Sequence, residues 1–163
     1  MMRWIPLSIC LALLAPAMAQ QKYNGPRPPK PDVPFLLHAG TLVETEVSQA
    51  KEEQRKDVNA ATIAGAASPV KTPLPEPIFL FLSEKIAPEK LEMYKLTVTK
   101  DGRREVAFPS AEKKRKDAPR PVHLSVSKLE TGLFRIEAGE VLDQGEYCLS
   151  PSGANQVYCF QVY

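Results

Sequence analysis

The stretch GEYCLSPSGANQVYCFQVY, Gly145–Tyr163, decides the fold of this chain. Two runs of strand-forming residues flank a Pro-Ser-Gly-Ala-Asn segment, an order that is typical of a β-hairpin. In one register of this hairpin, Cys148 lies directly opposite Cys159. A shift by one residue would turn every side chain to the other face, so the pattern predicts this register.

The same register sorts the side chains of the hairpin into two faces. Because side chains alternate along a strand, one face collects five large apolar residues and the other holds both cysteines. We therefore expect the apolar face to line the core and the cysteines to point away from it. The facing pairs on the apolar side are Tyr147–Phe160 and Leu149–Tyr158, and Val162 extends this face.

Residues 1–19 have the features of a secretory signal peptide. Arg3 supplies a positive charge, Ile5–Ala15 is apolar, and Ala17-Met18-Ala19 is a small-x-small cleavage site. We expect cleavage after Ala19 and a secreted or periplasmic protein. A membrane anchor is the alternative, but the apolar run is short of the roughly 20 residues that a span needs. No second apolar segment follows, so no membrane span is expected after cleavage.

Cleavage would remove Cys10 and leave two of the three cysteines. Two cysteines in an exported protein point to a disulfide, here between Cys148 and Cys159. Closing a loop of this size is worth roughly 2–3 kcal/mol on the chain-entropy model. The alternative is a pair of reduced thiols on the surface of a sheet.

Residues 20–34 are expected to form a proline-rich extended arm. Proline fixes φ and lacks an amide donor, so the segment should resemble polyproline II, and Arg27 and Lys30 make it basic. It could bind an aromatic groove or an envelope polymer, but a spacer or an arm laid along the domain is the simpler interpretation. The prolines are Pro26, Pro28, Pro29, Pro31 and Pro34.

Residues 35–163 are predicted to form a single β domain. Phe35–Leu37 is the expected first strand, and the very apolar Ile78–Leu82 is the expected central strand. Between them, residues 41–64 fit either a hairpin with a charged turn or a segment that contains a helix, and we favour the hairpin. The prolines in Gly65–Pro77 predict a loop that crosses from one sheet to the other.

Two further hairpins share one design, in which glycine takes the third position of a three-residue loop. The first joins Tyr94–Val98 to Val106–Phe108 through Lys100–Gly102, and sets Leu96 against Val106 and Tyr94 against Phe108. The second joins strands on either side of Glu130–Gly132 and sets Val126 against Ile136.

The spacing of these elements predicts about seven to nine short strands in an all-β, two-sheet sandwich of immunoglobulin-like architecture. Antibody-type domains are excluded, because their cysteine spacing is absent and Trp4 would leave with the signal peptide.

No catalytic, cofactor-binding or metal-binding residue is predicted. The two histidines, His38 and His123, have no carboxylate or cysteine at metal-ligand spacing. No nucleophile elbow, phosphate-binding loop or zinc-protease motif occurs. We therefore do not expect an enzyme, and a small periplasmic enzyme is the least favoured alternative.

The strongest local charge feature is Lys113, Lys114, Arg115 and Lys116, a possible site for an acidic partner or an anionic envelope polymer. Glu112 and Asp117 bracket this run, so a solvated loop is the simpler interpretation. The net charge of the whole chain is only +2, which gives no reason to expect nucleic acid as a partner.

These observations favour an exported, non-catalytic binding or structural module that interacts with an unidentified protein or polymer of the cell envelope. A carbohydrate-binding module is the alternative, and it would require Tyr147, Tyr158, Phe160 and Tyr163 to form an exposed platform. Alternation along the strands assigns the first three to the core instead.

Several segments resemble those of small uncharacterised secreted bacterial proteins. These segments are Pro34–Ala39, Leu42–Glu46, Gly145–Ser150 and Val157–Tyr163, so the resemblance extends over most of the mature chain. The resemblance implies export and a bacterial envelope setting. It implies no activity and no functional residue.

Overall fold

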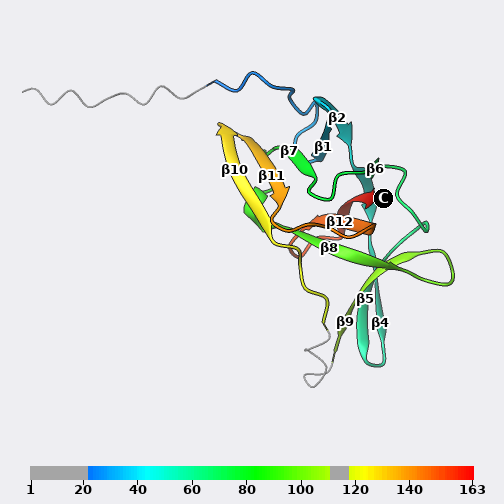
Figure 1. Cartoon of the computed structure of the whole chain (residues 1–163). Coiled ribbons are helices and arrows are strands. Elements are labelled where there is room, and N and C mark those ends of the chain that lie inside the picture. The colour runs from blue at the N-terminus through cyan, green and yellow to red at the C-terminus, as the bar shows by residue number, and fades with distance from the viewer. Residues whose placement is uncertain (1–21, 111–117) are drawn as a thin grey trace, which may run out of the picture.

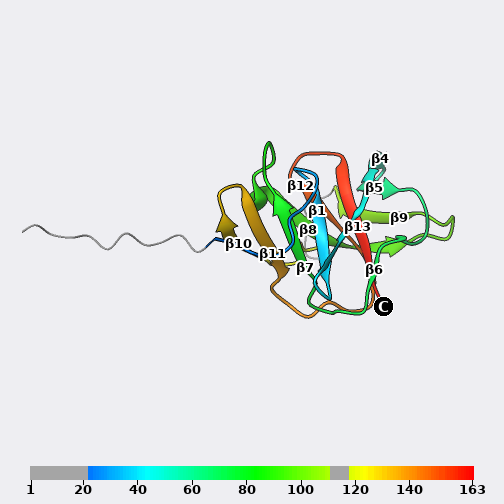
Figure 2. The ribbon, with the colours of Figure 1, turned by 90° about the horizontal axis from the view of Figure 1, so that it is seen from above.

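The computed structural model describes residues 22–110 and 118–163, which form an all-β fold without an α-helix in those ranges. The strands make two sheets that lie side by side in Figures 1 and 2. The five-stranded sheet has the order β10 (Leu124–Glu130), β11 (Leu133–Ala138), β7 (Ile78–Leu82), β1 (Pro34–His38) and β2 (Thr41–Glu44). The predicted central strand, β7, is indeed at its centre.

The second sheet is larger and strongly curved, and we call it the rolled sheet. Its neighbouring strands are antiparallel, except that the two-residue strand β6 (Lys71–Thr72) runs parallel to β13. A 3₁₀ turn, η1 (Pro88–Lys90), precedes β8. The strand order is β3 (Glu46–Gln49), β13 (Gln156–Val162), β12 (Gly145–Pro151), β8 (Leu91–Val98), β9 (Arg104–Pro109), β5 (Val58–Ile63) and β4 (Lys51–Arg55).

The terminal hairpin forms in the predicted register. Cys148 pairs with Cys159, and the facing pairs Tyr147–Phe160 and Leu149–Tyr158 occur as expected. Their apolar side packs against side chains of the five-stranded sheet in one buried cluster, where Phe79 meets Phe160 edge-on at 5.1 Å between ring centroids. The aromatic residues of the hairpin therefore belong to the core, and only Tyr163 is exposed.

The rolled sheet closes on itself through one segment of chain. Its two end strands, β3 and β4, are consecutive and are separated only by Ala50. The first half of this segment pairs with β13 and the second half pairs with β5. The backbone amide of Ala50 donates to the carbonyl of Asn155 at 2.8 Å, which holds the bend against the turn between β12 and β13.

This closure corrects one prediction for residues 41–64. The hairpin is present and the helix is not, but the charged run is strand β4 rather than a turn, and Lys56-Asp57 forms the turn. Interruptions at Thr45 and Ala50 divide residues 41–55 into three short strands. Such divisions raise the number of strands in the described residues to thirteen, above the expected seven to nine.

The hairpin of β8 and β9 has the predicted register, but its two strands are paired only next to the turn. Only Thr97–Glu105 and Val98–Arg104 are paired, after which the two strands diverge and join different neighbours. Gly102 has the predicted left-handed conformation, with φ of +74°. The hairpin of β10 and β11 pairs Val126 with Ile136 as predicted, with a shorter loop and a register shift between Lys128 and Glu130.

The described end of the N-terminal segment contacts the five-stranded sheet. Lys30 forms an ion pair with Glu44 of β2, and Arg27 forms one with Glu130 of β10. The carboxylate of Asp32 accepts hydrogen bonds from the backbone amides of residues 84–86, and its carbonyl accepts one from Tyr158 Oη at 2.6 Å. The predicted loop over residues 65–77 links the two sheets and contains β6.

Candidate functional site

The basic segment that the sequence indicated, Lys113–Lys116, lies outside the described residues. Its role in binding a partner therefore stays a prediction. In the described ranges, the strands of the rolled sheet enclose an interior of their own. Side-chain alternation along β12 turns Glu146, Cys148 and Ser150 toward this interior, in that order. The interior has three levels: a charged end, a disulfide layer and an open cavity.

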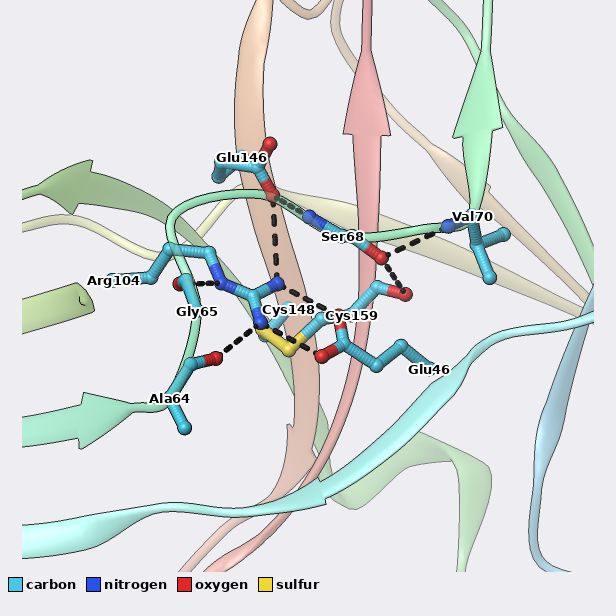
Figure 3. Close-up of a disulfide and its surroundings, with 9 residues drawn as sticks. All are labelled: Glu46, Ala64, Gly65, Ser68, Val70, Arg104, Glu146, Cys148 and Cys159. Carbon is cyan, nitrogen blue, oxygen red and sulfur yellow. Dashed lines mark hydrogen bonds and ion pairs between the residues drawn. A yellow bond between two sulfur atoms is a disulfide. The ribbon is translucent and has the colours of Figure 1, made fainter. Parts of the chain in front are cut away.

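Arg104 occupies the charged end and is fully buried. Its guanidinium makes a two-point contact with Glu46, at 2.7 Å for both nitrogen–oxygen distances, and a longer contact of 3.5 Å with Glu146 (Figure 3). It also donates to the backbone carbonyls of Ala64 and Gly65, each at 2.9 Å. All five N–H donors of the guanidinium therefore have an acceptor, which is what a buried arginine requires.

The surroundings of Glu46 and Arg104 favour the charged form of both side chains. Burial acts to raise the pKa of Glu46, but the hydrogen bonds from Arg104 and Ser68 and the charge of Arg104 outweigh it and hold that pKa below its usual range. The hydrogen bond to Glu46 raises the pKa of Arg104 in turn. The amide of Ser68 donates to Glu146 at 2.9 Å, so the loop after β5 is fastened to the same cluster. The arrangement is that of a structural ion pair.

Cys148 and Cys159 form a disulfide across β12 and β13 in the layer above the charged end. The pairing was predicted, and the cysteines point away from the aromatic core as expected. The sequence did not indicate that this second face is also covered. Cys148 and Cys159 are buried in a second apolar cluster, because the rolled sheet brings further strands over this face. Its other buried members are Ala50, Ile63, Leu96 and Val157.

The third level is a cavity of about 240 Å³ at the open end of the rolled sheet. Its floor is the upper side of the second apolar cluster, including Cys148. Half-buried side chains from β5, β8, β9 and β12 form its walls, and exposed residues from β4 and the turn between β12 and β13 form its mouth. The wall residues are Ala61, Glu92, Tyr94, Val106, Phe108 and Ser150, and the mouth residues are Glu52, Ser152, Gly153, Ala154 and Asn155.

The divergence of β8 and β9 makes room for this cavity. Tyr94 and Phe108 fill part of the gap between the two strands, where their rings meet edge to face at 5.5 Å. Burial, followed by the negative charge of Glu92, raises the pKa of Tyr94. The hydroxyl of Tyr94 thus keeps its proton at neutral pH and donates to Glu92 Oε2 at 3.1 Å.

Charge is distributed differently on the two faces of this sheet. On the outer face, Arg55 forms ion pairs with Glu53 and Glu105, and Arg103 forms one with Glu53. Of the charged residues in the described ranges, only two carboxylates, Glu52 and Glu92, line the cavity, and no basic residue there does so. Among the described residues neither of these two carboxylates takes part in an ion pair.

The two histidines lie apart from the cavity. His38 ends β1, opposite Thr41, rather than lying in a loop, and His123 is exposed as predicted. Within residues 22–110 and 118–163, no group of three or more histidine, cysteine or acidic side chains is placed to hold a metal ion.

Sequence reasoning missed the charged end, although its signal was present. The predicted hairpin placed Val106 and Phe108 opposite Leu96 and Tyr94 on one face, and Arg104 has the same parity on the same strand. A charged residue at a core position requires partners, which would have directed attention to the glutamates. The cavity had no comparable signal, because it depends on closure of the sheet.

No protein-family model matches this sequence, and comparisons with curated proteins and with solved structures found no match either. The resemblance to small secreted bacterial proteins therefore stays a prediction. None of the helical turns in the described ranges is long and apolar enough to cross a membrane.

Proposed function

We propose that this chain is an exported, non-catalytic interaction module of the cell envelope, and that the cavity of the rolled sheet receives a side chain of its partner. The observation that supports this proposal is an apolar recess of about 240 Å³ that is continuous with a buried cluster yet open at its mouth. An open recess with apolar walls offers binding energy to any group that can leave water and fill it.

The size of the recess favours a side chain over a whole metabolite. Pockets that enclose drug-sized ligands measure about 300–1,000 Å³, so this cavity is slightly too small for them. One aliphatic side chain projecting from a partner's surface would fit, and the surrounding turn and β4 would contact the partner's backbone. This arrangement resembles a hot-spot residue that fills a pocket at a protein interface.

The two alternatives have less support. A carbohydrate-binding platform requires several exposed aromatic residues, whereas Tyr147, Tyr158 and Phe160 are buried. An enzyme requires convergent reactive groups, and the raised pKa of Tyr94 makes its hydroxyl a poorer acid at neutral pH. The same proposal includes signal-directed export, a bacterial periplasmic or secreted location and an immunoglobulin-like arrangement of the two sheets. It retains Lys113–Lys116 and the proline-rich arm as further possible contacts with an acidic partner or polymer.

Site-specific photo-crosslinking in cells that export the protein tests the proposal. A photoreactive residue at Asn155, at the mouth of the cavity, should form an adduct with one partner, whereas the same residue at the exposed Ala66 should not. Ala61→Leu, which fills the cavity, should abolish the adduct, and Ala66→Leu is its matched control. Equal adducts at both positions, or an adduct that survives Ala61→Leu, would argue against the cavity as the binding site.

A further inference from the structure

We infer that the cavity selects a lysine side chain, an alkyl chain ending in an ammonium group, from a protein partner. This inference rests on the proposed function of the cavity and goes beyond it by naming the chemistry of the occupant. Two features support it. The inner part of the cavity is apolar and can hold the alkyl part of the side chain, and carboxylates without an ion-pair partner in the described ranges lie where the ammonium group would be.

The inner part of the cavity suits methylene groups. Its lining there consists of Ile63, Leu96, Val157 and the disulfide at Cys148, all buried. None of these groups offers a strong hydrogen bond, so a polar group placed among them would lose its hydrogen bonds to water without replacement. The four methylene groups of lysine can occupy such a space along an apolar wall while the charged end remains near water.

The outer part of the cavity suits a cation. Glu52 and Glu92 lie on two different strands, β4 and β8, and both line the cavity. The carboxylates of the outer face, Glu53 and Glu105, have an arginine partner on the same face of the sheet. Among residues 22–110 and 118–163, no basic residue lines the cavity. A cation bound at the mouth would therefore meet negative charge that the described residues leave unneutralised.

A hydrogen bond orients the carboxylate of Glu92 for contact with a cation. It accepts a hydrogen bond from Tyr94 through one oxygen, Oε2, which fixes the carboxylate while leaving further lone pairs free. The faces of Tyr94 and Phe108 add an aromatic surface within the same walls, which also attracts cations. A neutral chain would gain only the apolar contacts, and an acidic chain would be repelled at the mouth.

Three short peptides with unbranched side chains of similar length separate these contributions. They are acetyl-Gly-X-Gly-amide in which X is lysine, norleucine or aminoadipate, so that the chain ends in an ammonium, a methyl or a carboxylate. Titration into the ¹⁵N-labelled mature protein at pH 7 and low salt should give the order lysine, norleucine, aminoadipate. We expect lysine to bind about threefold to tenfold more tightly than norleucine, the range set by one or two exposed ion pairs.

The double variant Glu52→Gln, Glu92→Gln should remove the preference for lysine and leave the affinity for norleucine unchanged. Glu76→Gln is the control, because Glu76 is exposed and does not line the cavity. Raising the salt concentration should reduce the preference in the wild type only.

The outcomes distinguish this inference from the proposed function. If norleucine and lysine bind the cavity equally, or the preference survives the double variant, the inference of lysine selectivity fails while the cavity remains a binding site. A fourth titration, with hexylammonium, tests for a small free amine as the occupant. If hexylammonium binds but the lysine peptide does not, the inference of a protein lysine also fails. If no probe shifts the resonances of cavity residues, both the inference and the proposed function fail.

Discussion

The two ends of the rolled sheet share strands β9 and β12 but differ in how their carboxylates are paired. At the charged end, Glu46 and Glu146 surround a buried arginine whose donors are all used. At the cavity end, Glu52 and Glu92 border a recess that no basic residue lines in the described part of the chain. The arginine at the first end has no donor left for a ligand, because every N–H of its guanidinium already has an acceptor inside the fold.

This difference separates residues that stabilise the sheet from residues that are available for binding. A buried charge that loses its partner is costly, whereas an exposed carboxylate is solvated and can be replaced at little cost. Substitutions at the charged end should therefore change stability, and equivalent substitutions at the cavity should change binding alone. The following predictions test that separation, beginning with the largest effect.

Arg104→Ala should lower the free energy of unfolding by about 3–5 kcal/mol, because it leaves Glu46 and Glu146 near a vacated, desolvated site. Urea unfolding followed by fluorescence measures the change. Arg103→Ala is a close control, since this neighbouring arginine lies on the outer face and is partly exposed. A loss from Arg103→Ala as large as that from Arg104→Ala would contradict the assignment of the charged end.

The double variant Cys148→Ala, Cys159→Ala should lower the free energy of unfolding by about 2–4 kcal/mol, through the loss of a cross-link in the layer between the two ends. Unfolding curves with and without a reductant provide the measurement. Reductant should bring the stability of the wild type close to that of the variant and leave the variant unchanged. Free-thiol titration of the exported wild type should find no reactive thiol, and two reactive thiols would refute the disulfide.

Glu46→Gln should lower the free energy of unfolding by about 1–2 kcal/mol at pH 7, since the amide keeps an acceptor but loses the charge opposite Arg104. The pKa of Glu46 is depressed in the fold, so its contribution is present above the ordinary value of 4.5 and lost as pH falls through the lower folded pKa. The difference between wild type and variant should therefore shrink below pH 4.5. A difference that is constant from pH 7 to pH 3 would contradict the ion pair.

Glu52→Gln should leave the unfolding midpoint unchanged, because Glu52 is exposed and forms no ion pair among the described residues. The same variant should weaken binding of the lysine peptide at the cavity. Thermal unfolding and the peptide titration, measured on the same sample, make the comparison. A clear fall in the midpoint would mean that Glu52 supports the fold after all, and the contrast between the two ends would weaken.

Features with local signals were predictable from the sequence. The register of the terminal hairpin followed from Cys148 and Cys159, and the left-handed Gly102 followed from its place in a three-residue loop. These features depend on residues that are close along the chain, where alternation and turn chemistry act directly.

Closure of the sheet was not predictable in the same way. It depends on one segment, β3 and β4, which pairs with β13 at one end of the sheet and with β5 at the other. The alternation of apolar and polar residues in β2 and β3 also gives the wrong buried face. Val43 and Val47 are 40% and 44% exposed, whereas Thr45 is buried. The inward position at this end of the sheet is taken by Glu46, because the interior there is charged, so hydrophobicity does not mark the buried face.

The bend at Ala50 also constrains when the protein can acquire its shape. Strand β3 is synthesised well before its partner β13. The ring of strands, the cross-link within it and the recess beside it thus cannot assemble until β13 has been synthesised. Contacts this distant along the sequence also slow folding. Until then, the future closing strand β3 has unpaired backbone groups that can pair with wrong partners.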